Sequence, residues 1–288
     1  MNQKLSDPKK TIDVIQKYQF AFQKRFGQNF LIDAHVLEKI VNAAGITKDD
    51  CVLEIGPGIG TMTQYLAESA GQVIAVEIDT NLLPILTDTL KDYSNVKVIN
   101  QDILKVDINE LVKEYNNGRP IKVVANLPYY ITTPIIMGLF ESNVPIDNIT
   151  VMVQKEVAER LTAKTGTRLA GAITYAVEYY SDATSIIKVP KESFVPSPKV
   201  ESEVIKLKVR KGKKIQVKDE KLLFNIISKS FMQRRKTLSN VLTNNNIMHS
   251  KEDVKNMWKE LEIDENVRGE SLTLEQFGKI ADYISEKK

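Results

Sequence analysis

The chain has 288 residues, of which 42% are hydrophobic and 27% are charged. This composition excludes wholesale disorder and provides for roughly two domains of ~100–200 residues each. No apolar run approaches the ~18–20 residues that a membrane helix needs, and the first ten residues lack the apolar core of a secretory signal. We therefore expect a cytoplasmic protein that does not enter a membrane.

Cysteine and histidine are scarce in the chain. The single Cys51 cannot form an internal disulfide, and the two histidines, His35 and His249, form no metal-ligand cluster with it. We expect no bound metal.

The formal net charge of +3 is unevenly distributed. Residues 206–236 contain twelve Lys or Arg against two acids, Asp219 and Glu220, and a basic arm spans residues 1–30. Basic flanks on a mildly acidic body favour a nucleic-acid partner. Neither flank has the apolar face that binding to a membrane surface requires.

Short runs rich in Val and Ile recur along the first half of the chain, and they predict buried parallel strands. These runs are residues 51–55, 73–76, 96–99, 121–125 and 149–153. The intervals leave room for crossover helices, for example at 61–69 and 82–90. Two more helices (155–164 and 171–180) and two more strands (184–189 and 202–209) are expected next. The pattern predicts a doubly wound, Rossmann-like α/β sheet.

The pattern changes at residues 211–216, a charged stretch that is the best candidate for a linker. Beyond it all segments are helical, and the expected helices are 221–232, 237–244, 251–261 and 272–285. Thr273 and Gln276 form a predicted capping box. We expect an α/β domain over residues 1–210 and a small all-helical domain over 211–288.

The first strand leads into a glycine-rich turn with Glu54 before Gly56, Gly58 and Gly60. No GK[ST] sequence follows, so a phosphate-binding P-loop is excluded, and the third glycine is misplaced for a dinucleotide site. An acid before three glycines fits a nucleoside cofactor without pyrophosphate, namely S-adenosylmethionine (SAM). An ordinary tight turn is the alternative.

Acidic residues follow the next two strands. Glu77 ends the second strand, at a position from which it can accept hydrogen bonds from ribose hydroxyls, and Asp102 follows the third strand, where it can accept from an adenine amino group. Asp79 is expected to be solvated. Ligands lie at the carboxyl ends of such strands, so the acids and glycines predict one binding site.

The fourth strand ends in Asn126-Leu127-Pro128-Tyr129. An adenine N6 amine is a poor nucleophile because its lone pair is delocalised into the ring. The Asn126 side-chain oxygen and the Leu127 carbonyl can accept its N–H groups as the nitrogen becomes tetrahedral. Tyr129 offers a face on which a flipped-out base can stack. The motif predicts an adenine N6-methyltransferase.

Six segments carry a resemblance to a known family: residues 28–31, 54–60, 126–131, 194–200, 231–238 and 268–275. On these segments the chain resembles the ribosomal RNA adenine N6,N6-dimethyltransferases, and within them the KsgA type, over nearly its whole length. The resemblance implies SAM-dependent dimethylation of two adjacent adenosines in the 3′-terminal hairpin of 16S rRNA, with S-adenosylhomocysteine as product. It also implies a monomer that acts on 30S precursor particles during small-subunit biogenesis.

The resemblance also implies site residues. The implied cofactor contacts are Asn29, Leu31, Gly56, Glu77, Asp102 and Asn126. The implied catalytic group is Asn126, Leu127, Tyr129 and Phe194, with Phe194 closing over the target base opposite Tyr129. In the helical domain, the clustering of Arg234, Arg235 and Lys236 predicts contacts with RNA phosphates. In one departure from the family, Ala170 stands where an aromatic residue is usual.

Three alternatives remain open at this point. The first is the erythromycin-resistance type, which modifies 23S rRNA; Leu127 and the Arg-rich helical domain favour the small-subunit type. The second is a ribosome-assembly binding factor whose methyl transfer is secondary. The third is a DNA adenine methyltransferase, in which a second proline usually replaces Leu127.

Overall fold

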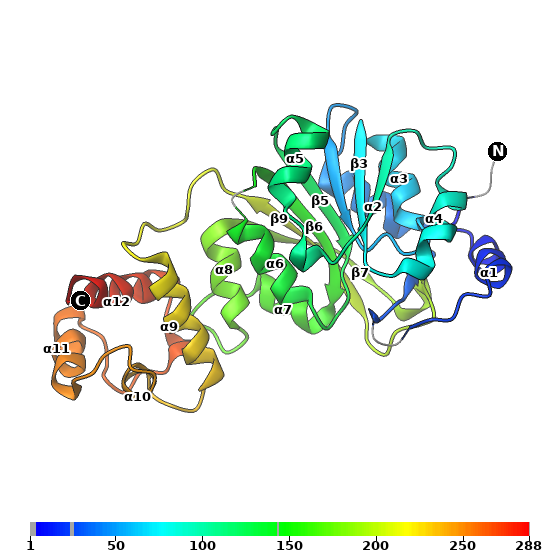
Figure 1. Cartoon of the computed structure of the whole chain (residues 1–288). Helices are drawn as coiled ribbons and strands as arrows, with labels where there is room; N and C mark the ends of the chain where they lie inside the picture. Colours follow the sequence, from blue (N-terminus) through cyan, green and yellow to red (C-terminus); the bar gives the residue numbers. More distant parts are fainter. Residues whose placement is uncertain (1–3, 24–25, 143, 288) are drawn as a thin grey trace. The chain divides into compact units, whose positions relative to one another are not determined.

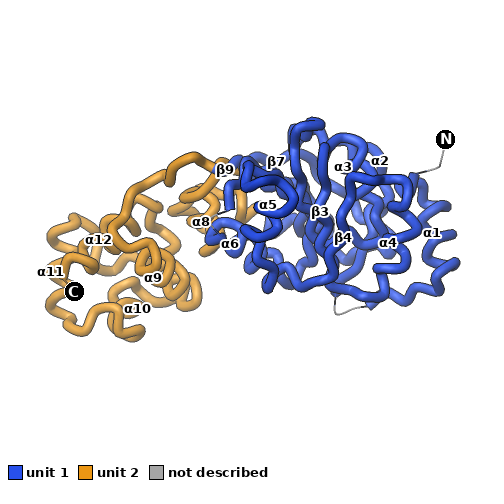
Figure 2. The backbone as a smooth tube through the Cα atoms, turned by 45° about the horizontal axis from the view of Figure 1, so that its top comes forward, with its two compact units in different colours: residues 1–158, 184–209 blue, residues 159–183, 210–288 orange. Residues whose placement is uncertain are grey.

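The chain folds into two compact units. Figure 1 shows the chain coloured along its sequence, and Figure 2 shows the two units in different colours. The computed structural model describes residues 4–23, 26–142 and 144–287. The first unit comprises residues 1–158 and 184–209, and the second comprises residues 159–183 and 210–288. These units differ from the expected domain ranges in one segment, 159–183, which packs with the helical part of the chain.

A seven-stranded sheet forms the core of the first unit, and only the first residues of its last strand belong to the second unit. In spatial order its strands are β4 (Val96–Asn100), β3 (Gln72–Glu77), β2 (Cys51–Ile55), β5 (Ile121–Asn126), β6 (Ile146–Gln154), β9 (Ser202–Val209) and β7 (Ser181–Val189). The first five strands in this spatial order, β4, β3, β2, β5 and β6, are parallel to one another. Strand β9 is antiparallel to β6. The prediction of a doubly wound α/β sheet is confirmed.

Helices cover both faces of this sheet, which is why its central strands are apolar on both faces. All five residues of β2 are buried. Figure 1 shows α5 and α6 on the face opposite to α2 and α3. The helices of the first unit are α1 (Pro8–Lys17), α2 (Ala34–Ala44), α3 (Thr61–Ser69), α4 (Leu83–Thr89), α5 (Ile108–Asn116), α6 (Thr132–Glu141) and the start of α7 (Lys155–Thr162).

A small antiparallel sheet joins two segments that lie far apart in the sequence. It pairs β1 (Phe30–Leu31) with β8 (Phe194–Val195). The Ser193 hydroxyl donates to the Asp33 carboxylate at 2.8 Å, next to this pair. The QNFL segment (residues 28–31) is thereby fixed against the rest of the first unit.

The second unit is helical. Its helices are α8 (Ala172–Tyr180), α9 (Glu220–Met232), α10 (Leu238–Asn244), α11 (Lys251–Leu261) and α12 (Leu274–Lys287). The Tyr175 ring of α8 packs edge-on against Phe277 of α12 and beside Phe231 of α9, and its hydroxyl donates to the Leu272 carbonyl at 2.6 Å. These contacts explain why α8 joins this unit.

The linker at residues 211–216 stays a prediction, and the capping box at Thr273 is confirmed. Residues 211–216 contain neither helix nor strand. The Thr273 hydroxyl accepts the Gln276 N–H at 3.3 Å, and the Gln276 side chain accepts the Thr273 N–H at 2.9 Å, as a capping box requires. Over the described ranges, the helices are too short or too polar to cross a bilayer.

Candidate active site

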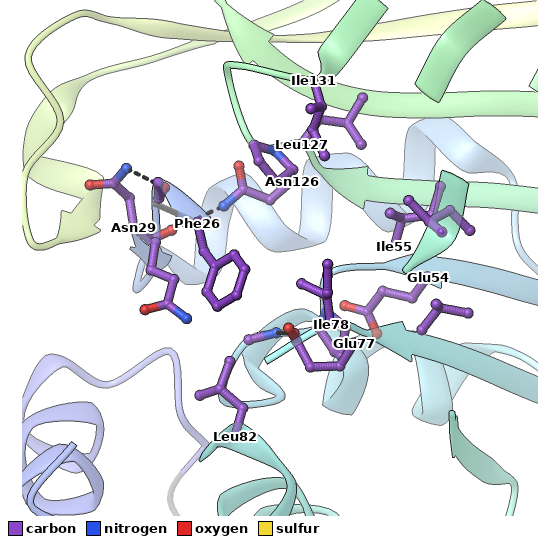
Figure 3. Close-up of a pocket in the computed structure, with 18 of the residues that line it drawn as sticks. Phe26, Asn29, Glu54, Ile55, Glu77, Ile78, Leu82, Asn126, Leu127 and Ile131 are labelled. Atoms are coloured by element: carbon purple, nitrogen blue, oxygen red, sulfur yellow. Dashed lines mark hydrogen bonds between the residues drawn. The ribbon is translucent and has the colours of Figure 1, made fainter. Parts of the chain in front are cut away.

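A pocket lies at the carboxyl ends of the parallel strands, at the point where the strand order reverses. From β2 the chain passes outward to β3 and β4 and then returns to β5 on the other side of β2. Ligands of open α/β sheets bind at such a switch point. The loops after β2, β3, β4 and β5 line the pocket together with residues 26–31 (Figure 3). Its empty volume, including the part open to solvent, is about 1050 Å³.

Gly58 shows why the turn after β2 requires glycine. Its φ of +61° is left-handed, and a Cβ at this position would lie 3.0 Å from two carbons of the Phe30 ring. Its N–H donates to the Glu77 carboxylate at 3.1 Å. The backbone of this turn therefore lines the pocket. Thr61, the first residue of α3, lines the pocket as well. Free N–H groups at a helix start suit a polar ligand.

Glu77 ends β3 at the pocket wall, as predicted. Its side chain is 5% exposed, and it accepts backbone N–H groups from Gly58 at 3.1 Å and Asp79 at 2.8 Å. Burial raises the pKa of Glu77 to about 7, although these N–H groups oppose the shift. The carboxylate is therefore rigidly placed and retains lone pairs for a ligand.

Glu54 is a second acid in the pocket that sequence reasoning did not assign as a binding residue. It is fully buried and lines the pocket beside Glu77 (Figure 3). Among the described residues, neither of its oxygens has a hydrogen-bond partner. Burial raises the pKa of Glu54 to about 8; the nearby Thr63 hydroxyl opposes the shift and the Glu77 carboxylate adds to it. An acid inside an otherwise apolar strand was the signal that could have identified it.

Asp102 lies where expected, but the expectation for Asp79 was wrong. Asp102 lines the pocket after β4 and accepts the Leu104 N–H at 3.0 Å. Asp79 is 2% exposed rather than solvated. It accepts side-chain amide N–H groups from Gln28 at 2.7 Å and Gln23 at 3.2 Å. Amide donors of the N-terminal segment replace water around this carboxylate.

Asn126 ends β5 and points into the pocket from the side opposite to Glu77 (Figure 3). Its Nδ2 donates to the Asn29 carbonyl at 3.1 Å, so Oδ1 is left to accept from a ligand. The Leu127 N–H donates to the Met152 carbonyl of β6 at 3.1 Å, which fixes the turn that follows. Tyr129 lines the pocket within this turn.

The QNFL segment closes one side of the pocket. Asn29 and Leu31 both line it, and the Asn29 side chain donates to the Gly27 carbonyl at 2.9 Å. Phe194 is paired with Leu31 in the small sheet but does not line the pocket. Its ring is 3% exposed and packs in the core with Leu31 and Val36. The structure therefore places Phe194 in this core and not at the pocket. The predicted contact between Phe194 and the target base would require the ring to leave the core.

The structure places Arg234, Arg235 and Lys236 in the turn after α9 of the second unit, and all three are exposed. Arg234 is also a structural contact: Nη2 donates to the Ala170 carbonyl at 2.9 Å, and the guanidinium lies 4.9 Å from the Phe231 ring centre. Within the described part of the chain, none of the three forms an ion pair with an acid.

In the ranges that the structure describes, no three His, Cys, Asp or Glu side chains gather as metal ligands do. The polar groups of the pocket are acids, the amides of Gln28, Asn29, Gln101 and Asn126, and backbone N–H groups. The ionised forms of the two buried carboxyl groups would stabilise a ligand that carries positive charge, and such a ligand would in turn lower their raised pKa values.

Comparison with known proteins identifies the family. The family model for ribosomal RNA adenine dimethylase matches residues 19–286. A relative from Lachnoclostridium phytofermentans, named ribosomal RNA small subunit methyltransferase A, is 61% identical, and the alignment covers 98% of each chain.

Two solved structures share the fold. A dimethyladenosine transferase from Plasmodium falciparum is 26% identical with a TM-score of 0.71, covering 87% of this chain and 95% of the other. The 23S rRNA methyltransferase ErmE is 24% identical with a TM-score of 0.66, covering 89% of this chain and all of the other. With the family match over nearly the full length, these findings show that the chain belongs to the ribosomal RNA adenine dimethylase family.

Proposed function

We propose that this chain transfers methyl groups from SAM to the N6 amines of two adjacent adenosines in the 3′-terminal hairpin of 16S rRNA, during small-subunit biogenesis. The observation that carries the proposal is the Asn126 amide at the pocket, whose Nδ2 is held by the Asn29 carbonyl so that Oδ1 can accept an amine N–H. The name of the 61% identical relative supports small-subunit rRNA as the substrate.

The pocket fits SAM by the chemistry of its side chains. SAM is cationic at sulfur and at its amino group, and its positive charge would be stabilised by ionised Glu54 and Glu77 in the pocket. Glu77 would accept from the ribose hydroxyls and Asp102 from the adenine amine. Gly56 and Leu31 would line the ligand, with Asn29 and Asn126 nearby. When bound, SAM supplies a methyl group on a positively charged sulfur.

Asn126 and Leu127 act on the amine that attacks. During methyl transfer the attacking nitrogen would become tetrahedral and positively charged. The Asn126 Oδ1 and the Leu127 carbonyl accept its N–H groups and stabilise this charge before a proton passes to water. Acceptors that are already fixed need not reorganise during the reaction. Tyr129 supports the base by stacking.

Arg235 and Lys236, together with Arg234, are proposed to contact RNA phosphates. Their exposure and their lack of acidic partners among the described residues leave the charges available. A ribosomal RNA substrate supports a cytoplasmic location, and we propose that the chain acts as a monomer on the 30S precursor particle.

The test compares substrates directly. Purified protein is incubated with tritiated SAM and naked 16S rRNA, 30S particles, 23S rRNA or 50S subunits, and labelled nucleosides are identified. We expect N6,N6-dimethyladenosine in the small-subunit samples alone. Label in 23S rRNA would favour the erythromycin-resistance type, and particle binding without label would favour an assembly factor.

A further inference from the structure

The hydroxyl groups of Tyr129 and Ser202 lie 2.7 Å apart and form a hydrogen bond. Among the contacts of the described residues, it is the one bond that either hydroxyl makes. Ser202 is 1% exposed and does not line the pocket, whereas Tyr129 does. We propose that Ser202 is a positioning residue: it holds the Tyr129 ring in place for the target adenine without touching either substrate. This inference rests on the proposed function.

Ser202 can serve this purpose because its backbone is fixed. It begins β9 and pairs with Gln154 at the end of β6. The preceding residue is also held, since the Lys155 N–H donates to the Glu201 carbonyl at 3.0 Å and the Lys155 ammonium pairs with the Glu201 carboxylate at 3.0 Å. The Ser202 hydroxyl therefore presents a rigid anchor.

Tyr129 does not belong to a strand or a helix. It lies in the turn between β5 and α6, outside both elements. Stacking on a base requires the ring to occupy one position, and an unanchored tyrosine can populate other χ1 rotamers. A hydrogen bond from the ring hydroxyl to a fixed partner restricts which of these rotamers the side chain occupies.

The geometry of tyrosine determines what the bond fixes. The hydroxyl lies on the long axis of the ring, so the bond sets where the ring points but leaves rotation about that axis free. If Tyr129 moved away, the buried Ser202 hydroxyl would lose its partner, and leaving a buried hydroxyl unpaired is unfavourable. The bond thus favours a single ring position, ready for a flipped-out adenine.

The test is a double-mutant cycle on the full chain, with Ser202→Ala, Tyr129→Phe and both together. For each variant, kcat and KM for the rRNA substrate, SAM affinity by calorimetry and the unfolding temperature are measured. We expect each single variant to lower kcat roughly 2- to 10-fold, the decrease typical of removing one hydrogen bond. SAM affinity should stay unchanged, and the double variant should be no slower than either single one, because both remove the same bond.

Two further variants control for structure. Ser202→Thr retains a hydroxyl and should recover part of the rate. Ser181→Ala removes a serine hydroxyl that is also 1% exposed but bonds to the Val177 carbonyl at 2.9 Å, and its kcat should match the wild type. If Ser202→Ala fails to fold, Tyr129→Phe still tests the bond, because it removes the tyrosine hydroxyl and leaves Ser202 in place.

Wild-type kcat in Ser202→Ala or Tyr129→Phe would overturn the inference, as would effects that multiply in the double variant. These outcomes assume that the wild type methylates rRNA. If it does not, the proposed function itself fails, and the two failures are thereby distinguished.

Discussion

The pocket of the first unit and the basic turn of the second unit (residues 234–236) hold the side chains of their candidate sites in opposite ways. In the pocket, the Glu77 carboxylate and the Asn126 amide are tied to backbone groups, and the Tyr129 hydroxyl is tied to a buried serine. In the turn, Arg235 and Lys236 extend into solvent. Methyl transfer depends on groups fixed before the reaction, whereas binding of RNA phosphates depends on charge and reach.

The largest effect is expected for Asn126→Ala, which tests whether the fixed side chains of the pocket carry out catalysis. Removing one fixed acceptor that acts on the transition state costs on the order of 10²–10³ in rate. Methylation and particle binding, assayed side by side, should show turnover reduced by this factor with normal RNA binding. Near-normal turnover at saturating SAM would contradict the role of Asn126.

The same variant can be examined in cells. Stalled small subunits in cells with this variant, but not in a deletion strain, would indicate that the protein also controls a step of subunit assembly.

Glu77→Ala should weaken SAM binding roughly 10- to 150-fold, since charge-assisted hydrogen bonds contribute ~1.5–3 kcal/mol. Calorimetric titration measures the change, and circular dichroism checks the fold. Asp79→Asn is the matched control, because that buried acid bonds to Gln23 and Gln28 within the protein. Equal decreases of SAM affinity in the two variants would argue against a specific role for Glu77.

The buried acids should also make stability depend on pH. The pKa of Glu54 rises from its ordinary 4.5 to about 8 on folding, so between these values the folded state binds more protons than the unfolded state. Stability of the ligand-free protein should therefore be greatest below pH 4.5 as far as this group contributes, and fall as pH rises towards 8. One such proton changes the folding equilibrium by at most about tenfold per pH unit.

Urea titrations across this range measure the slope, and Glu54→Gln removes the titrating group while retaining its size. The variant should show a flatter dependence than the wild type. An identical slope would assign the effect to other groups.

The smallest effects are expected in the basic turn, where they distinguish two neighbouring arginines. Removing one side chain that neutralises an RNA phosphate should flatten the slope of log K against log salt by about 0.7–0.9. Arg235→Gln should flatten the salt slope without changing the unfolding temperature. Arg234→Gln should also lower the unfolding temperature, because Arg234 bonds to the Ala170 carbonyl. If neither variant changes the salt slope, the turn is only a solvated surface.

The sequence predicted most of the sheet and the pocket because both depend on local patterns. The apolar runs became β2 to β6, and Gly56, Glu77, Asp102 and Asn126 line one pocket because parallel strands end at one edge. The environment of Asp79 depends on glutamines more than fifty residues earlier in the chain, so no local pattern could reveal it. The core position of Phe194 and the packing of α8 likewise depend on distant partners.

The second unit is made of two stretches of chain, and α8 lies in the shorter one. Tyr175 of that helix covers Phe231 and Phe277, which belong to the longer stretch. A gene fragment that begins at residue 210 would therefore encode an incomplete core, with these rings uncovered. Recombination between relatives cannot exchange the helical unit as one continuous cassette. An exchange that preserves this core must carry residues 159–183 together with residues 210–288.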